Sequence, residues 1–174
     1  MRFLIAALLS LFAFAAVANE QDHGHDDHDD HGSEELADSE HKATLGDVTL
    51  LHAWAAETEG SEVFVYVEID NEGDAPITLL GAEAEIAGAV ELVGFQSKDG
   101  VASYAPLPML LIASGAELIL APNAVAFRMT DVTKHLHEGD DFEIHIIFDA
   151  GEVVMMAQVE PEGATQHGHA GHNH

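Results

Sequence analysis

Cysteine is absent from this 174-residue chain, and basic residues are scarce. Without cysteine the protein has no disulfide framework and no thiolate ligand. A stable fold must therefore come from its hydrophobic core, and a bound metal must be held by histidine, methionine, carboxylate or backbone groups. Five lysines and arginines stand against 32 aspartates and glutamates, which gives a formal net charge of −27. Such a charge repels nucleic acid and anionic lipid, and it attracts cations and basic protein surfaces.

Long apolar runs are missing after residue 18. The first 18 residues combine Arg2, an apolar run from Phe3 to Phe14, and the small-residue ending Ala16-Val17-Ala18. This pattern predicts a cleaved secretory signal and not a membrane anchor, and no cysteine follows it that could be lipidated. We therefore expect an exported, periplasmic protein without stable membrane insertion.

Histidine is present in excess, and most of it lies near the two ends. Residues 19–42 and 161–174 have few large apolar side chains, so we expect both to be disordered tails that flank one domain over residues 43–160. Imidazoles two or three residues apart, in the first tail among aspartates, can converge on one ion. The predicted metal ligands are His23, His25, His28, His31, His41, His167, His169, His172 and His174.

The donor types narrow the choice of metal. Nitrogen and oxygen ligands suit Cu(II), Zn(II) and Ni(II), and the usual order of affinity places Cu(II) first. If both ends of the domain lie at one place, the two tails could share an ion, which the sequence leaves open.

The region between the tails has the two-residue period of β-strands. In residues 63–69, valines and isoleucine alternate with Phe64, Tyr66 and Glu68, and turn residues follow. Runs of this kind, separated by turn signals, predict seven or eight strands in an antiparallel sandwich or Greek-key barrel. The other runs are residues 48–54, 77–82, 89–95, 117–120, 124–129, 142–148 and 153–159. Helix is expected at most as a single turn over Val132 to His137.

Two turns in this region are specific: Asn71 to Pro76 after a strand, and Glu138-Gly139-Asp140 before one. Together with segments 98–101, 118–122 and 129–132, they make residues 47–159 resemble the periplasmic copper chaperone family PCu(A)C. The resemblance implies an all-β, cupredoxin-like antiparallel β-sandwich of Greek-key topology. It also implies that Cu(I) is carried toward the copper site of cytochrome oxidase, with oxidase assembly factors or a metal transporter as partners.

In that family two histidines and two methionines hold the copper ion. By the same resemblance, their positions correspond to Val93, Tyr104, Ala126 and Arg128 in this chain. None of these side chains is an imidazole or a thioether, and the Arg128 cation disfavours a metal ion. The family's copper site is therefore expected to be lost, which leaves the tails as the principal metal ligands.

Four histidines remain within the domain. His52 and His145 lie in strand-like runs and are interpreted as strand-face residues. His135 and His137 are separated by one residue and could form a minor metal site.

The sequence thus predicts a copper chaperone-like metal-binding protein that captures, delivers or buffers copper through its tails. The alternatives are a zinc-binding buffer or chaperone, and a metal-free interaction module of an oxidase-assembly or metal-transport system. An enzyme is not expected, because the sequence has no Ser-His-Asp order, phosphate-binding glycine loop or paired acids that stand out.

Overall fold

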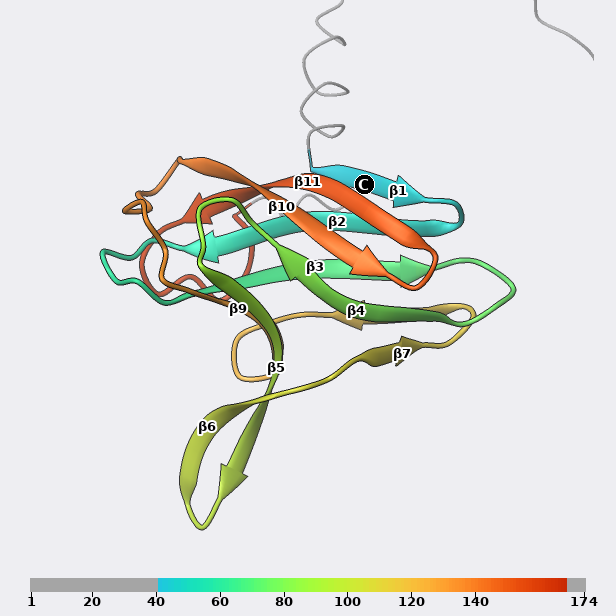
Figure 1. Ribbon diagram of the computed structural model, residues 1–174, viewed down its shortest axis with the longest axis horizontal. Helices are drawn as coiled ribbons and strands as arrows, with labels where there is room; N and C mark the ends of the chain where they lie inside the picture. Colours follow the sequence, from blue (N-terminus) through green and yellow to red (C-terminus); the bar gives the residue numbers. More distant parts are fainter. Residues whose placement is uncertain (1–40, 169–174) are drawn as a thin grey trace, which may run out of the picture. The chain divides into compact units, whose positions relative to one another are not determined.

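The structure, a computed structural model, describes residues 41–168. This part of the chain contains eleven β-strands (Figure 1). Within these residues no helix is long and apolar enough to cross a membrane. The strands are β1 (Lys42–Leu45), β2 (Val48–Ala56), β3 (Val63–Asn71), β4 (Ile77–Glu83), β5 (Ala89–Lys98), β6 (Val101–Pro106), β7 (Leu110–Ile112), β8 (Ala116–Ile119), β9 (Val125–Thr130), β10 (Asp141–Phe148) and β11 (Gly151–Glu160).

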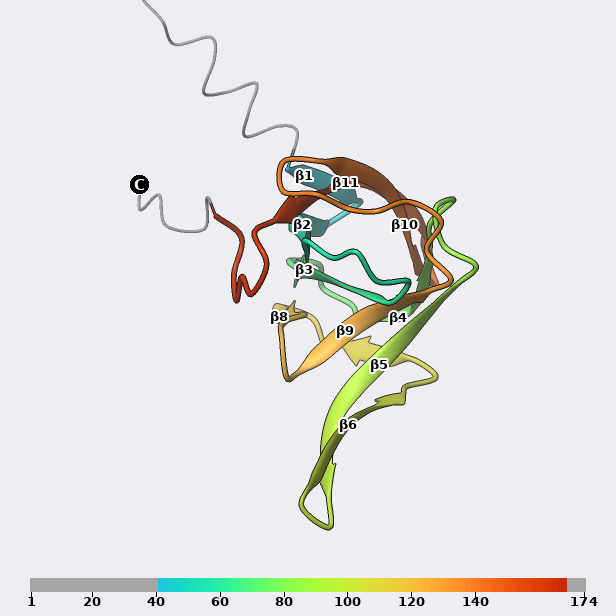
Figure 2. The ribbon, with the colours of Figure 1, turned by 90° about the vertical axis from the view of Figure 1, so that its left-hand side faces the viewer.

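The strands form one sheet in the order β6-β5-β9-β3-β2-β11-β10-β4-β7, with β1 paired to β2 and β8 paired to β3. Every pair is antiparallel except β11 and β2, which run parallel. The sheet curls around a common core and brings β4 against β5, as the view along the strands shows (Figure 2). The all-β prediction is confirmed, with one parallel pair that it did not include.

The core lies on the inner face of the curl, and strand alternation fills it. In β3 the side chains of Val63, Val65, Val67 and Ile69 are buried in the main hydrophobic cluster, as the two-residue period predicts. Glu68 and the residues on its side of the strand face outward. Burial of branched side chains at this spacing supplies most of the stability that a chain without disulfides needs.

Eight predicted strands are present, and three further strands were not predicted. These are β1, β6 and β7, which are short or poor in large apolar residues, so their periodicity is weak. The single helical turn predicted over Val132 to His137 is wrong, because the described chain is irregular there. Leu136 instead is fully buried and forms an isolated β-bridge with Thr58.

The turn after β3 depends on the buried amide of Asn71. Its Nδ2 lies 2.9 Å from the carbonyl oxygen of Ala75 and 3.2 Å from that of Ile112, and its Oδ1 accepts a hydrogen bond from the Gly73 amide. One side chain thus ties the turn to the end of β7. This accounts for the specificity of the turn motif in the sequence.

A hairpin of β5 and β6 projects from the sheet (Figure 1). Its turn has Asp99 at φ 54° and Gly100 at φ 79°, the two positive φ angles that a tight two-residue hairpin loop requires. Val101 at the tip is 66% exposed.

The chain continues after β11 in a defined path through residues 161–168. A turn closes with the Ala164 amide donating to the Pro161 carbonyl oxygen, and His167 is only 2% exposed. The sequence predicts a disordered tail from residue 161, whereas this first part packs against the sheet. Residues 169–174, like residues 1–40, lie outside the described part of the chain.

Candidate metal centre

Three histidines from separate segments meet beside the bulged part of β2. His41 precedes β1, His52 lies within β2, and His167 belongs to the segment that follows β11. The ring centroids are 6.3 Å apart for His41 and His52, 5.4 Å for His41 and His167, and 5.1 Å for His52 and His167. The pairing of both β1 and β11 with β2 brings the two ends of the domain together at this strand.

His52 reaches this cluster because β2 contains a β-bulge. Leu51 pairs with Glu68 and Trp54 pairs with Tyr66, so His52 and Ala53 together stand opposite a single residue of β3. His52 has φ 52°, a left-handed conformation that costs about 1–3 kcal/mol for a residue other than glycine. Its backbone amide donates a 2.9 Å hydrogen bond to the carbonyl oxygen of His41.

The bulge changes which residues of β2 face inward. Before it, Val48 and Leu50 belong to the main core; after it, Ala53 and Ala55 do. A shift of one residue moves every following side chain to the other face of the sheet. Trp54 therefore packs in a second, outer cluster, and His52 leaves the inner face.

The imidazole of His167 is held by two side chains at the end of β11. Its Nε2 lies 2.9 Å from Oε1 of Gln158 and 3.5 Å from Oε1 of Glu160. Both oxygens are acceptors, so Nε2 carries the proton and donates, and in the neutral ring Nδ1 has the lone pair. The same Glu160 oxygen accepts a hydrogen bond from the Gly168 amide.

A polar atom at the cluster lacks a hydrogen-bond partner among residues 41–168. It is Nδ1 of His52, which is inaccessible to solvent. A buried nitrogen without a partner is unfavourable unless something else satisfies it.

The cluster is not a finished coordination site. Among the described residues, no three histidine, aspartate or glutamate side chains are placed so that they could hold a metal ion. Of the predicted ligands, His41 and His167 lie together here. The other seven, which are His23, His25, His28, His31, His169, His172 and His174, fall outside the described residues.

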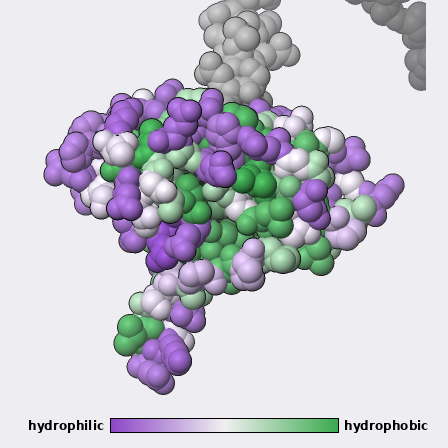
Figure 3. All heavy atoms as spheres, in the orientation of Figure 1, coloured by the Kyte–Doolittle hydropathy of each residue, from purple (hydrophilic) through white to green (hydrophobic). Residues whose placement is uncertain are grey.

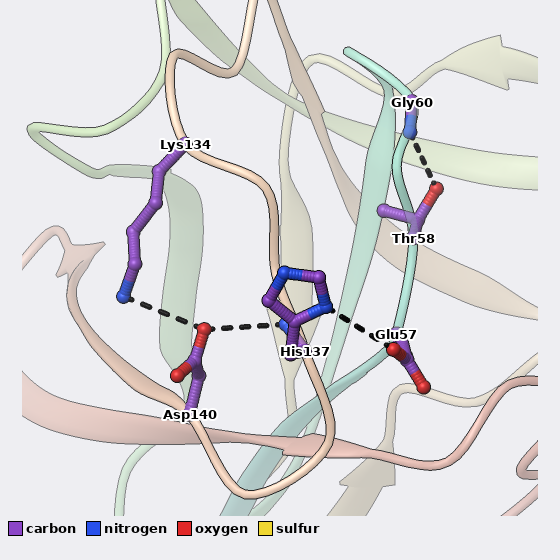
Figure 4. A network of polar contacts seen from close by, with 6 residues as sticks. All are labelled: Glu57, Thr58, Gly60, Lys134, His137 and Asp140. Carbon is purple, nitrogen blue, oxygen red and sulfur yellow. Dashed lines mark hydrogen bonds and ion pairs between the residues drawn. The ribbon is translucent and has the colours of Figure 1, made fainter.

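Two other histidines of the domain, His137 and His145, lie elsewhere and contact carboxylates. Nδ1 of His137 is 3.3 Å from Oε1 of Glu57, and its backbone amide donates to Asp140, whose carboxylate also faces Lys134 (Figure 4). The His137 amide is the main reason that the pKa of Asp140 lies below its ordinary value. These contacts occupy the place where a minor site with His135 was predicted.

His145 is a strand-face residue, as predicted. It lies between Glu143 and Glu152 on the outside of the β10–β11 hairpin, with a carboxylate at each ring nitrogen. Hydrogen bonds to Glu152 and then to Glu143 raise its pKa above the ordinary value.

The four positions that correspond to the family's copper ligands share one outer face of β6, β5 and β9. Val93 pairs directly with Ala126, and both are completely buried. Tyr104 lies two residues along β6 from the partner of Val93, and Arg128 lies two residues along β9 from Ala126. The positions therefore converge as the resemblance implies, and apolar and aromatic side chains fill most of the space.

Aromatic residues extend this apolar face toward the histidines. The ring centroids of Phe64 and Tyr104 are 4.6 Å apart, as are those of Trp54 and Tyr66. Val93 and Ala126 pack in the same cluster, and Ala164 from the C-terminal segment covers it. Burial, with Tyr104 beside it, raises the pKa of Tyr66 above its ordinary value.

Arg128 does not face an open site. Its NH2 group forms a 2.5 Å ion pair with Glu91, the residue opposite it on β5. The guanidinium thus bonds a carboxylate across the strands, at a position that by the resemblance corresponds to a methionine ligand.

Two cavities differ in size and lining. The smaller, of about 80 Å³, lies at the histidines and is lined by His52, Trp54, Val67, Glu68, Ile119, Leu120, Ala121, Thr165, Gln166 and His167. The larger, of about 320 Å³, is a hollow between β4, β5 and β10 whose lining residues are mostly of apolar type, and Figure 3 shows hydrophobic residues gathered on the surface there. No histidine is among its described lining residues, so of these two cavities the smaller is the one with imidazole ligands for a metal ion.

His52 is the cluster residue that the sequence prediction did not select. Its signal is a break in alternation: Leu50, Leu51, Ala53, Trp54 and Ala55 are apolar on both strand faces around a single histidine. A buried strand gives the same pattern, so the bulge is not evident from sequence alone.

Comparison with known proteins agrees with this fold. A family model described as putative lipoprotein LpqE-like matches residues 48–159. The name refers to lipoproteins, although this sequence contains no cysteine to carry a lipid thioether. No curated protein matches the chain.

Similar solved structures are PCuAC domains and a related protein. The apo PCuAC domain from PmoF1 is 26% identical, with a TM-score of 0.59, over 70% of this chain and 99% of that one. The copper-bound PCuAC domain from PmoF2 is 23% identical, with a TM-score of 0.59, over 70% and 98%. The Cu(I) form of DR1885 from Deinococcus radiodurans is 22% identical, with a TM-score of 0.52, over 64% and 77%. The chain belongs to the LpqE-like family, and its described domain has the cupredoxin-like PCuAC fold that the sequence predicts.

Proposed function

We propose that this protein is a periplasmic, copper chaperone-like metal-binding protein that captures copper through its histidine-rich tails and delivers or buffers it. The observation that carries the proposal is that the two tails join the domain at neighbouring places. His41 and His167 lie beside each other, with ring centroids 5.4 Å apart. Tails that begin at one place can contribute ligands to the same ion, and a chain with several partial ligand sets can release that ion stepwise.

Copper is the first metal of the proposal. Domains of similar fold include a copper-bound and a Cu(I) form, and imidazole donors favour Cu(II) over Zn(II) in the usual order of affinity. The type of ligand available determines which oxidation state of copper is favoured. Because Val93, Tyr104, Ala126 and Arg128 offer no soft donor, histidine-based binding favours Cu(II) over Cu(I). Zinc is the second candidate, since the same donors suit it.

The proposed partners follow from location and charge. Export by the expected signal would place the protein in the periplasm, where an oxidase assembly factor or a metal transporter could receive the ion. A net charge of −27 favours a partner with a basic docking face.

A titration tests the proposal. The chain from residue 19 onward is titrated with Cu(I), Cu(II) and Zn(II), and so is a variant with all nine tail histidines replaced by asparagine. We expect the variant to lose most of its Cu(II) capacity, while the control His135→Asn keeps it. Equal capacity in the variant and the parent would show that the tails do not bind the metal.

A metal-free interaction module is the second candidate function. It is favoured by the loss of all four copper-ligand positions and by the exposed apolar tip of the β5–β6 hairpin, where Phe95 is 37% and Val101 66% exposed. Under this alternative, capture of the periplasmic partner would be equally efficient with and without a chelator. Under the metal-binding proposal, the chelator would reduce it.

A further inference from the structure

We propose that His41, His52 and His167 are ligands of one divalent Cu(II) or Zn(II) ion, at a site distinct from the family's copper positions. The inference rests on the proposed function, because it names the place in the domain to which the tails bring their metal. It also assigns a ligand role to His52, which belongs to neither tail.

The spacing of the rings fits a shared ion. Three imidazoles on one ion, with metal–nitrogen bonds of about 2.0–2.1 Å, have ring centroids roughly 5 to 5.5 Å apart. Two of the observed separations, 5.1 and 5.4 Å, lie in this interval, and the third, 6.3 Å, exceeds it. Binding therefore requires rotation of the rings and a small approach of His41 to His52. This explains why the described side chains do not yet form a coordination site.

Hydrogen bonds indicate which nitrogen of His167 carries the proton, and His52 has a buried nitrogen that lacks a partner among residues 41–168. Gln158 and Glu160 accept the Nε2 proton of His167, which leaves the lone pair on Nδ1. Metal-binding histidines commonly donate their second nitrogen to a carboxylate or amide oxygen in this way. On His52, the solvent-inaccessible Nδ1 lacks a partner among residues 41–168, and a metal ion would satisfy it.

The cavity beside these rings has the size for an ion. Its volume of about 80 Å³ is well below the roughly 300 Å³ from which small-molecule pockets begin. Glu68 is also among the lining residues, so an acidic residue borders the same cavity as His52 and His167. A hydrated metal ion suits this space better than an organic ligand does.

Backbone strain is present at the same residue. His52 stands at φ 52° in a β-bulge, and such outliers recur where a fold must aim a side chain at a functional site. Without the bulge, His52 would follow Leu50 into the hydrophobic core. The bulge thus turns its imidazole toward His41 and His167, where the two tails join the domain.

The test separates this site from the other tail histidines. Residues His23, His25, His28, His31, His169, His172 and His174 are replaced by asparagine in the chain from residue 19 onward, so that only the cluster and the other domain histidines remain. Trp54 is the only tryptophan and lines the same cavity, so its fluorescence reports on the site. We expect this variant to bind one equivalent of Cu(II) with quenching of Trp54, and Zn(II) to compete.

Further substitutions in this background identify the ligands. His52→Asn preserves the left-handed backbone, which asparagine tolerates. His167→Gln changes a residue outside the sheet and guards against misfolding of the first variant. Each should weaken Cu(II) binding by about 100-fold or more, since the loss of outer-shell groups alone costs about 10- to 100-fold. The nitrogen couplings in the Cu(II) electron paramagnetic resonance spectrum should fall from three imidazoles to two, while His135→Asn changes nothing.

The outcomes are distinguishable. If the unsubstituted chain binds no metal, the proposed function fails. If it binds metal but the variant without the seven tail histidines does not, the proposed function stands and this site is overturned. The site is also overturned if His52→Asn and His167→Gln both bind Cu(II) as tightly as their background.

Discussion

Two regions of the same outer face have opposite chemistry. Around Val93 and Ala126, which by the resemblance correspond to copper-ligand positions, the side chains are apolar and tightly packed. A short distance along the face, beyond Trp54, His52 and His167 line a small cavity, and the ring of His41 lies near both. The comparison shows that apolar packing at one place on the face does not prevent histidines from gathering at another, because His41, His52 and His167 come from other segments of the chain.

Introducing histidine and methionine at the four apolar-face positions should have the largest effect, because it would remove the difference between the two regions. The variant Val93→His, Tyr104→Met, Ala126→His, Arg128→Met places two imidazoles and two thioethers on neighbouring positions of β5, β6 and β9. We expect it to gain an equivalent of tightly bound Cu(I) that the parent lacks, since soft donors suit Cu(I). Competition with a Cu(I) chelator measures this. If no Cu(I) is gained, the face differs from its relatives in more than its ligands.

Trp54 lies at the boundary of the two regions and should contribute mainly to stability. It is 5% exposed and packs against Tyr66. Trp54→Ala should lower the free energy of unfolding by about 3–5 kcal/mol, the usual range for removal of a large buried aromatic side chain. Urea denaturation followed by far-ultraviolet circular dichroism measures it. A loss below about 1 kcal/mol would mean that the apolar region is not a packed core.

Substitution of His52, the residue in the bulge, should change the unfolding free energy less than Trp54→Ala does, by an amount that depends on the new residue. His52→Val places a β-branched side chain at φ 52°, so we expect a loss of about 1–3 kcal/mol in unfolding free energy. His52→Asn tolerates that backbone and should change stability by less than about 0.5 kcal/mol. Equal losses in the two variants, measured by the same denaturation, would argue against strain at this position.

Substitution of Glu160, which contacts the proposed ligand His167, should weaken metal binding without affecting folding. Glu160 lies 3.5 Å from Nε2 of His167 and is partly buried. Glu160→Gln removes the carboxylate charge, and we expect Cu(II) affinity to fall by about 10-fold with little change in unfolding. The matched control is Glu162→Gln, an exposed residue of the same segment. The interpretation fails if both variants bind Cu(II) alike.

His145, outside both regions, gives the smallest effect and shows what a histidine without a metal role does. Its pKa is raised, mainly by Glu152, so the stabilisation from its charged form is complete below the ordinary value of 6.5 and is lost as pH rises through the raised pKa. Proton NMR titration should give a pKa above 6.5 in the parent and a lower one in Glu152→Gln. Glu143→Gln should lower it less.

The fold was predictable from the sequence to a large extent because its signals are local. Alternation in residues 63–69, the Asn71 turn and the Asp99-Gly100 loop each fix a strand or a turn by nearby chemistry. Strands β1 and β7 were not predicted, since their pairing partners, and not their composition, make them strands.

The candidate site was predictable only in part. His41 and His167 were selected from composition, but their proximity arises from the parallel pairing of β11 with β2, which alternation does not reveal. His52 was interpreted as a strand-face residue because a bulge depends on register with β3. The order of residues 161–168 was missed for a similar reason: the hydrogen bonds of His167 and Gly168 to the end of β11 are specific contacts in a segment of low-complexity composition.

The pairing of β1 and β11 with the same strand has a consequence for a chain without cysteine. An ion held by both His41 and His167 would join the two ends of the described domain into a closed loop. For a disulfide, closing a loop of about 100 residues is worth roughly 5 kcal/mol in the chain-entropy model. A metal ion bound here would act as a cross-link that needs no oxidant. The cross-link would form when the ion binds and open when the ion is released. The stability of the domain would then itself report whether the protein is loaded.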